Sequence, residues 1–168
     1  MRTDSDKAQL YDRQLRLWQK DGQAALERAR VLVFGSSTLA SESLKNLVLP
    51  GIGGFTVVDD ATVGEQDART NFFVRPTDVG QSRAQCIVAN LSELNPDVVG
   101  QAVVASAVDF MESHAESFDT ASVVIACGQP ESVVCELSRR CEKANIPILA
   151  ASSAGFQAEV LTSVSEHT

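Results

Sequence analysis

The order of apolar and polar positions along the chain predicts strands that alternate with helices. Two short apolar runs, 31–34 and 55–58, are typical of buried strands. Between them, residues 41–49 have the apolar spacing of a helix, and this helix is expected to end at Pro50-Gly51. A β–α–β unit of this length makes a right-handed parallel crossover. The chain is therefore expected to contain a parallel sheet.

The alternation continues to the end of the chain. Residues 4–30 have helical spacing with a break near Asp21-Gly22. Further helices are expected at 81–94 and 131–144, and further strands at 98–104, 122–127, 146–149 and 157–164. This pattern predicts an α/β fold with a mostly parallel sheet and helices on both faces. Ligands of such sheets bind beyond the carboxyl ends of the strands, which here are followed by residues 35–40, 59–61 and 128–131.

Composition and charge exclude several classes of protein. The chain has 168 residues, of which 44% are hydrophobic and 21% charged, as expected for one folded domain. A net charge of −8 argues against binding to nucleic acid, and no stretch approaches the roughly 18 apolar residues of a membrane span. The first residues are polar and mixed in charge, unlike a signal or transit peptide. We expect a cytoplasmic or nuclear protein with neither a membrane nor a nucleic acid as partner.

The four cysteines do not suggest a metal site. Cys86, Cys127, Cys135 and Cys141 form no CxxC pair, and no histidine lies near them in the sequence. Their contexts also lack the neighbouring base that activates a thiolate. Reduced thiols that act as small hydrophobic or surface side chains are the expectation, with no metal bound and no catalytic residue in this chain.

The first strand leads into an altered phosphate-binding loop. Residues Gly35 to Ala40 follow the G-x-G-x-x-G/A pattern except at the middle glycine, which is replaced by Ser37. A backbone that carries a Cβ there cannot closely approach a pyrophosphate at the helix N-terminus. Asp59 lies at about the distance downstream at which an acid binds a ribose hydroxyl. We interpret the loop as a turn retained for packing, although a bound nucleotide stays a minor alternative.

Several segments resemble a known family. They are YDRQLRLW (11–18), LKNLVLPGIGGFTVVD (44–59), NFF (71–73), LNPDV (94–98) and IPILAASSAGF (146–156). These segments resemble the adenylating family that contains the bacterial ThiF and MoeB enzymes and the activating enzymes of ubiquitin-like modifiers. The resemblance is strongest to the regulatory subunits of heterodimeric activating enzymes, with those of neddylation favoured over those of SUMO. It implies a Rossmann-like ThiF-type fold over 11–168, with its carboxyl-terminal part missing, after a flexible N-terminus of residues 1–10.

The resemblance also implies that the nucleotide pocket has degenerated. Active members have a glycine at the position of Ser37, a ribose-binding aspartate at that of Ala61 and a phosphate-binding arginine at that of Thr70. Their G-x-x-K lysine corresponds to Arg83 and their magnesium-binding aspartate to Gln129. A neutral amide cannot replace an anionic magnesium ligand. Gly35, Ser37, Asp59, Arg83 and Gln129 are thus expected to outline a degenerate pocket.

The N-terminal segment is expected to act on a partner. In this family the arginine of Y-D-R-Q reaches across a dimer interface to the ATP of the active subunit, and the corresponding residue is Arg13. Tyr11, Leu15 and Trp18 are candidates for the apolar part of that interface. Two alternatives stay open: Arg13 pairs with Asp12 or Glu27 on a solvated helix, and the apolar residues pack on their own domain.

The resemblance therefore implies a non-catalytic subunit that binds a catalytic subunit and a ubiquitin-like modifier. On this hypothesis the chain binds no cofactor alone, and ATP and Mg²⁺ are bound by the partner. A self-sufficient ThiF/MoeB-type adenylating enzyme and a nicotinamide-dependent oxidoreductase are the alternatives. The oxidoreductase would have to bind its dinucleotide at the loop in which Ser37 replaces the middle glycine.

Overall fold

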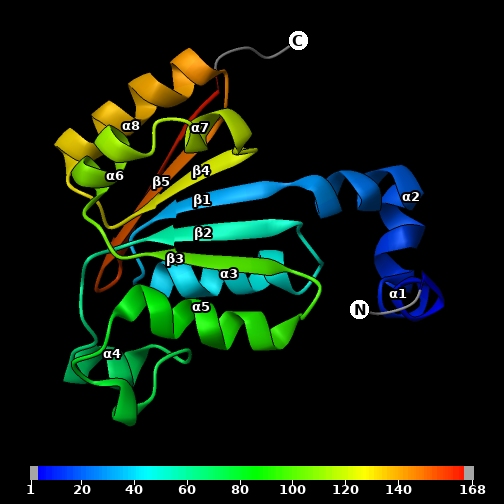
Figure 1. Cartoon of the computed structure of the whole chain (residues 1–168), viewed down its shortest axis with the longest axis horizontal. Helices are drawn as coiled ribbons and strands as arrows, with labels where there is room; N and C mark the ends of the chain where they lie inside the picture. The colour runs from blue at the N-terminus through cyan, green and yellow to red at the C-terminus, as the bar shows by residue number, and fades with distance from the viewer. Residues whose placement is uncertain (1–3, 165–168) are drawn as a thin grey trace.

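A computed structural model describes residues 4–164 and has an α/β fold built on one six-stranded sheet (Figure 1). The strands are β1 (Arg30–Phe34), β2 (Gly54–Val58), β3 (Val99–Val103), β4 (Val123–Cys127), β5 (Ile148–Ala154) and β6 (Gln157–Ser163). They lie in the order β3-β2-β1-β4-β5-β6. All neighbouring pairs are parallel except β5 and β6. The predicted mostly parallel sheet is confirmed.

Helices cover both faces of this sheet, as the sequence predicted. The helical segments are α1 (Asp4–Leu10), α2 (Asp12–Arg28), α3 (Thr38–Val48), α4 (Glu65–Thr70), the 3₁₀ turn η1 (Pro76–Asp78), α5 (Arg83–Leu94), α6 (Ala107–Ser113), α7 (Ser117–Thr120) and α8 (Glu131–Ala144). Helices α3 and α5 pack on one face, and α6, α7 and α8 on the other. Along residues 4–164 no helix is long and apolar enough to cross a membrane.

Alternation along the central strand creates two cores. Val31 and Val33 of β1 face the core beneath α3 and α5, whereas Leu32 and Phe34 face the core beneath α6 to α8. After the exposed Arg30, the four remaining residues of β1 are apolar and buried, because both faces of the sheet are covered. This explains why the short apolar runs located β1 and β2 within one residue, whereas β5, predicted at 146–149, spans Ile148–Ala154.

The N-terminal helical region differs from its prediction. The chain turns between α1 and α2 at Tyr11, and α2 is kinked at Gln19, which has a φ of 60°. The predicted break near Asp21-Gly22 corresponds to this kink, which lies two residues before Asp21, while Gly22 itself lies inside the helix. A Cβ at Gly22 would lie 2.7 Å from Cδ1 of Trp18, so the glycine makes room for the indole rather than ending the helix. The expected flexible N-terminus falls on α1 over residues 4–10, and residues 1–3 lie outside the described residues.

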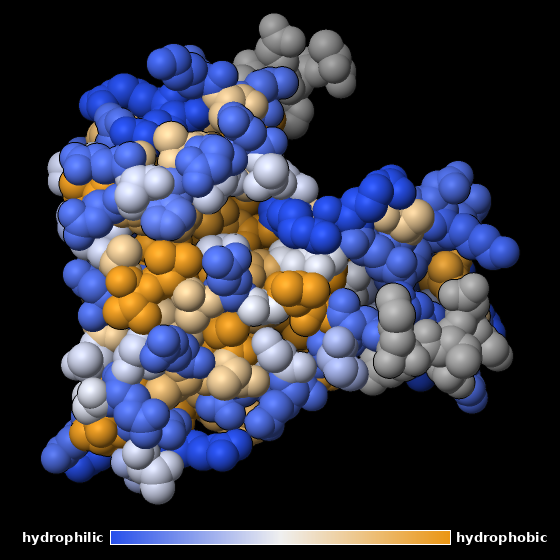
Figure 2. All heavy atoms as spheres, viewed as in Figure 1, coloured by the Kyte–Doolittle hydropathy of each residue, from blue (hydrophilic) through white to orange (hydrophobic). Residues whose placement is uncertain are grey.

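Helices α1 and α2 form an N-terminal arm (residues 4–28) that projects from the body of the molecule beside β1 (Figure 1). The visible surface of this arm is mostly hydrophilic (Figure 2). Tyr11 anchors the arm: its side chain is 3% exposed, and its hydroxyl accepts a hydrogen bond from Nδ2 of Asn95 at 2.8 Å. Gln14 and Gln23 each donate a side-chain hydrogen bond to the carbonyl of Pro50, both at 3.1 Å. The arm is therefore fixed at its base.

The anchor predicts a measurable loss of stability in the variant Tyr11→Phe. Removal of the hydroxyl leaves the buried amide of Asn95 with one fewer acceptor, at a cost of about 1 kcal/mol in the free energy of unfolding. Urea denaturation of the full chain measures this change. The matched control is Leu17→Ala, because Leu17 is 77% exposed on the same helix and should lose less than Tyr11→Phe. Equal or larger destabilisation by Leu17→Ala would contradict this anchoring role.

Candidate functional site

The candidate site lies where β1, β2 and β4 end, at the carboxyl edge of the sheet. Gly35 follows β1 with a φ of 91°, which favours glycine. A Cβ at this position would overlap the carbonyl oxygen of Cys127 at the end of β4. The amide of Gly35 also donates to the carbonyl of Val58 at 2.9 Å. Gly35 therefore fixes the turn that joins β1 to α3, regardless of any ligand.

The α3 N-terminus is directed at a side chain of the same protein. Ser36 is fully buried, and both its backbone N–H, at 3.0 Å, and its hydroxyl donate to Oδ2 of Asp59. Ser37 is the N-cap residue of α3 and makes no side-chain capping bond. Oδ1 of Asp59 accepts the backbone N–H of Ala61 at 3.1 Å. Thus both carboxylate oxygens of Asp59 are hydrogen-bonded within the protein.

Arg83 completes a network with Asp59, Ser36 and Asp67, which we call the Asp59–Arg83 network. Its Nη2 lies 2.9 Å from Oδ2 of Asp59, and its Nη1 lies 3.2 Å from Oδ1 of Asp67. Nε of Arg83 donates to the hydroxyl of Ser36 at 3.0 Å. The side chains of Arg83 and Asp59 are only 21% and 11% exposed. The guanidinium of Arg83, in the first turn of α5, therefore bonds Asp59 at the end of β2, Ser36 just before α3 and Asp67 of α4. It can do so because its planar fork presents several donors.

The network keeps Asp59 ionised. Burial by itself raises the pKa of Asp59, but the hydrogen bonds from Ser36, Arg83 and Ala61 and the charge of Arg83 together lower it below its ordinary value. The ionised carboxylate therefore stabilises the folded state above the unfolded pKa of Asp59. This contribution is lost as the pH falls through the lower pKa of the folded state.

The residues at this edge do not fit ATP and Mg²⁺. The resemblance assigns ribose binding to the position of Ala61, and Asp59, two residues before it, is bonded to Arg83. It assigns phosphate binding to the position of Thr70, which is exposed and donates to the carbonyl of Gln66. Gln129 offers a neutral amide, whose Nε2 donates weakly to the carbonyl of Cys127 at 3.5 Å. The chemistry of a triphosphate requires anionic ligands for the metal ion and cations that face an open crevice.

The structure brings the five predicted pocket residues close to one another. Gly35, Ser37, Asp59 and Arg83 surround the start of α3, and the amide of Gln129 lies beside Gly35, where a Cβ on that glycine would meet Nε2 of Gln129 at 2.9 Å. Sequence analysis missed Ser36 and Asp67, which are the remaining partners of Arg83 and Asp59. A signal for Asp67 exists, since an acid in the first turn of a short helix lies close to the strand end.

Burial raises the pKa of three of the four cysteine thiols. It raises the pKa of Cys127 and of Cys141 to about 11, and it also raises that of Cys86. A raised pKa disfavours the nucleophilic thiolate. Cys135 lies exposed on α8. Within residues 4–164, no group of three acidic, histidine or cysteine side chains is arranged to bind a metal ion.

The predicted interface residues on the arm differ in exposure. The side chain of Arg13 is exposed and forms no hydrogen bond or ion pair with the side chains of residues 7–164, whereas Asp12 pairs with Arg16 at 2.8 Å. The alternative that Arg13 pairs with Asp12 or Glu27 is therefore wrong. Tyr11 was assigned to a partner interface, but this assignment needs correction because its side chain is buried in its own domain.

Leu15 and Trp18 behave differently from Tyr11. Leu15 is half-buried and Trp18 is partly exposed, with its Nε1 donating to Oε1 of Gln23 at 3.3 Å. Leu17, which the sequence analysis did not single out, is 77% exposed. Arg13, Leu17 and part of Trp18 therefore remain on the surface of the arm.

Comparison with known proteins identifies the family. Residues 11–168 match the ThiF family. The chain belongs to this family. It is 42% identical over 164 residues to the NEDD8-activating enzyme E1 regulatory subunit of Danio rerio, covering 98% of this chain and 31% of that protein. It is 40% identical over 163 residues to the Drosophila melanogaster subunit of the same name (97% and 31%). The Caenorhabditis elegans subunit is 37% identical over 163 residues (97% and 30%).

The similarity covers nearly all of this chain and a minor part of each relative. The chain spans about 30% of the length of the relatives that it matches. The ThiF assignment confirms the Rossmann-like fold that the sequence resemblance implied. It also agrees with the resemblance to neddylation subunits, because relatives from several animals carry that name.

The Asp59–Arg83 network predicts that Arg83→Met destabilises the full chain. The substitution leaves two acids without their cation, at a cost of about 1–3 kcal/mol in the free energy of unfolding. Arg83→Lys should recover part of the loss, since one ammonium cannot reproduce the fork that bonds Ser36, Asp59 and Asp67. Denaturant titration at neutral pH measures both variants.

Arg69→Met is the matched control for this network. Arg69 pairs with Glu65 at 3.7 Å on the same helix as Asp67, but both side chains are largely exposed. Its removal should change the free energy of unfolding by less than about 0.5 kcal/mol. If Arg83→Met were no more harmful than Arg69→Met, the network would not stabilise the fold.

The lowered pKa of Asp59 predicts a pH dependence. The stability difference between the wild type and Asp59→Asn should be constant from neutral pH to about pH 5. It should decrease as the pH falls below about 4, because the wild-type carboxylate then takes up a proton and loses its ionic bonds. Unfolding followed by circular dichroism across this range measures the difference. A difference that grew towards acid would show that the pKa of Asp59 is raised.

Proposed function

We propose that this chain acts as a non-catalytic subunit in the activation of a ubiquitin-like modifier of the NEDD8 type. In this function it binds a catalytic subunit and contributes Arg13 in trans to the ATP site of that subunit. The observation that carries the proposal is the Asp59–Arg83 network. In this network Arg83 bonds Asp59, which lies in the crevice where an active family member is expected to bind its nucleotide.

The state of Arg13 supports the second part of the proposal. An arginine finger must reach a neighbouring active site with its charge unpaired in its own subunit. Arg13 is exposed on the projecting arm, and its side chain has no partner among the side chains of residues 7–164. The anchored base of the arm, at Tyr11, limits the entropy lost when the arm docks. Leu17 and Trp18 offer apolar surface beside it.

The relatives supply the biological setting. They are named regulatory subunits of the NEDD8-activating enzyme, and this chain matches about 30% of their length. We therefore assign to the partner the binding of ATP and Mg²⁺ and the adenylation of the modifier. The proposed location is cytoplasmic or nuclear.

The proposal predicts the result of ATP–pyrophosphate exchange in the presence of modifier and magnesium. The full chain alone should give no exchange, and mixing with the catalytic subunit should produce it. Arg13→Ala should lower kcat/KM of the mixture by at least about tenfold, because the triphosphate loses a cation in the transition state.

Arg16→Ala is the matched control, because Arg16 is exposed on the same helix and pairs with Asp12. It should leave kcat/KM within about twofold of the wild type. Exchange by the chain alone would refute the non-catalytic assignment and favour a self-sufficient ThiF/MoeB-type enzyme. Equal effects of the two alanine variants would refute the assignment of Arg13.

A further inference from the structure

Helix α2 contains a backbone conformation that is costly for any residue other than glycine. Gln19 has a φ of 60° and a ψ of −172°, and the two halves of the helix meet there at a kink. This region of φ and ψ is populated almost only by glycine, because a Cβ crowds the backbone. The side chain of Gln19 is exposed. The strain at Gln19 is therefore offset by contacts that other residues of the arm make.

Two glutamine side chains hold the halves of α2 against the same turn. Gln14 lies before the kink and Gln23 nine residues later, and both donate to the carbonyl oxygen of Pro50 at 3.1 Å. In an unbroken helix, nine residues turn the chain by about 900°, so the two side chains would point in opposite directions. The kink is what brings them to one acceptor.

The kink also requires glycine at position 22. A Cβ on Gly22 would lie 2.8 Å from Cβ of Trp18 and 2.7 Å from Cδ1 of its indole. In an unbroken helix, the Cβ atoms of residues four apart lie about 5–6 Å from each other. A side chain at position 22 therefore clashes in the kinked helix but not in a straight one.

These features define two states of the arm. In the bent state, which the structure shows, α2 is kinked at Gln19, and Tyr11 is buried and bonded to Asn95. In the straight state, Gln19 has helical φ and ψ, and the 17 residues of α2 form one helix about 25 Å long. The straight state is free of the strain at Gln19 but loses the contacts of the arm with Pro50 and Asn95. Because these contributions oppose each other, a small change can shift the balance between the states.

The position of Arg13 depends on this balance. Arg13 lies before the kink, so its direction differs between the two states. A fixed direction lowers the entropy lost when an arginine finger meets its target. We propose that Gln19 and Gly22 are positioning residues, which bend the arm and hold Arg13 in the direction from which it reaches the ATP site of the catalytic subunit. This inference rests on the function proposed for Arg13.

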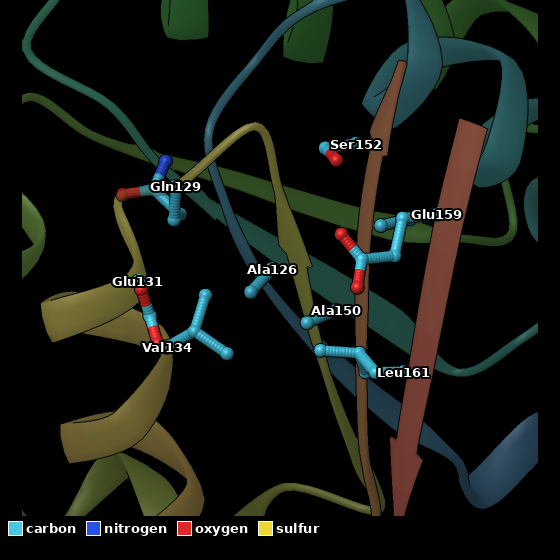
Figure 3. Close-up of a pocket in the computed structure, with 9 residues that line it drawn as sticks. Ala126, Gln129, Glu131, Val134, Ala150, Ser152, Glu159 and Leu161 are labelled. Atoms are coloured by element: carbon cyan, nitrogen blue, oxygen red, sulfur yellow. The ribbon is translucent and has the colours of Figure 1, made fainter. Parts of the chain in front are cut away.

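The kink is remote from the crevice of this chain. Helix α2 leads into the amino end of β1, whereas Gln129 and Glu131 follow the carboxyl end of β4 and line a pocket beside α8 (Figure 3). Substitutions at positions 19 and 22 should therefore affect ATP chemistry only through the arm.

The first test measures how fast tetranitromethane nitrates Tyr11, the single tyrosine of the sequence, in the full chain. Tyr11 is 3% exposed in the bent state, and straightening exposes it. Gly22→Ala should speed nitration by at least about tenfold, because the added methyl group clashes in the bent state. Gln19→Gly should slow it by about fivefold, since glycine adopts the kinked backbone without strain.

Matched controls separate bending from general effects on the helix. Lys20→Gly and Asp21→Ala lie at exposed, helical positions beside the kink, and both should stay within about twofold of the wild type. Amide exchange of residues 31–34 of β1 shows whether the whole domain has unfolded. Faster nitration counts as straightening only where this exchange is unchanged.

The second test is ATP–pyrophosphate exchange by the mixture with the catalytic subunit. Gly22→Ala should lower kcat/KM by at least about threefold, because a smaller fraction of the arm is bent. Adding Gln19→Gly to this variant should recover part of the loss. In the Arg13→Ala background, Gly22→Ala should have no further effect, since the kink acts through Arg13.

The two tests fail in different ways. Equal nitration of the wild type, Gln19→Gly and Gly22→Ala would overturn the two states of the arm, whatever Arg13 does. Faster nitration of Gly22→Ala with unchanged exchange activity would overturn the positioning role. A neutral Arg13→Ala would refute the function of Arg13 and the positioning role with it, while the nitration rates would still decide whether the arm has two states.

Discussion

The ion pair between Arg83 and Asp59 determines how the carboxyl edge of this sheet is built. An aspartate at the end of β2, only 11% exposed, needs bonds for both oxygens, since an unpaired buried charge is costly. Ser36, Ala61 and Arg83 supply those bonds from three different segments of the same chain. The edge that binds ligands in related folds is therefore occupied by the side chains of the protein itself.

This constraint has a consequence for the rest of the molecule. Asp67 joins the same cation, so α4 is attached to the end of β2 and the start of α5 without a ligand between them. The exposed Arg13 lies elsewhere, on the arm whose helix α2 leads into the amino end of β1. The fold thus separates this crevice from the exposed arm.

Periodicity predicted the fold well, because the parallel strands are buried on both faces and their helices carry clear apolar faces. The prediction of α8 over 131–144 matched its bounds, and Asn145 ends it in a left-handed conformation. Local pattern was less exact in the N-terminal helix. The break was placed near Gly22 because glycine is a poor helix former, but the kink lies at Gln19 and Gly22 packs against the indole of Trp18 one turn earlier. The short helices α4, α6 and α7 were also missed, since seven or fewer residues give little periodic signal.

The motifs that carried the family resemblance pack against one another in the structure. Tyr11 of YDRQLRLW contacts Asn95 of LNPDV, and the side chains of Gln14 and Gln23 bond the carbonyl of Pro50. Sequence analysis assigned Tyr11 to an interface because spacing shows which residues share a helix, but not which of them meet their own domain. The sequence predicted a degenerate pocket from its substitutions alone, and this stays a prediction. The bonded network around Asp59 became visible only with the positions of Ser36 and Asp67.

The central claim is that the Asp59–Arg83 network takes the place of a nucleotide. Isothermal titration of Mg-ATP into the full chain tests it most directly. The account predicts no saturable heat of binding at millimolar ATP, with or without magnesium. Saturable micromolar binding that disappears in Arg83→Met would contradict it, because Arg83 would then be bonding the nucleotide rather than Asp59.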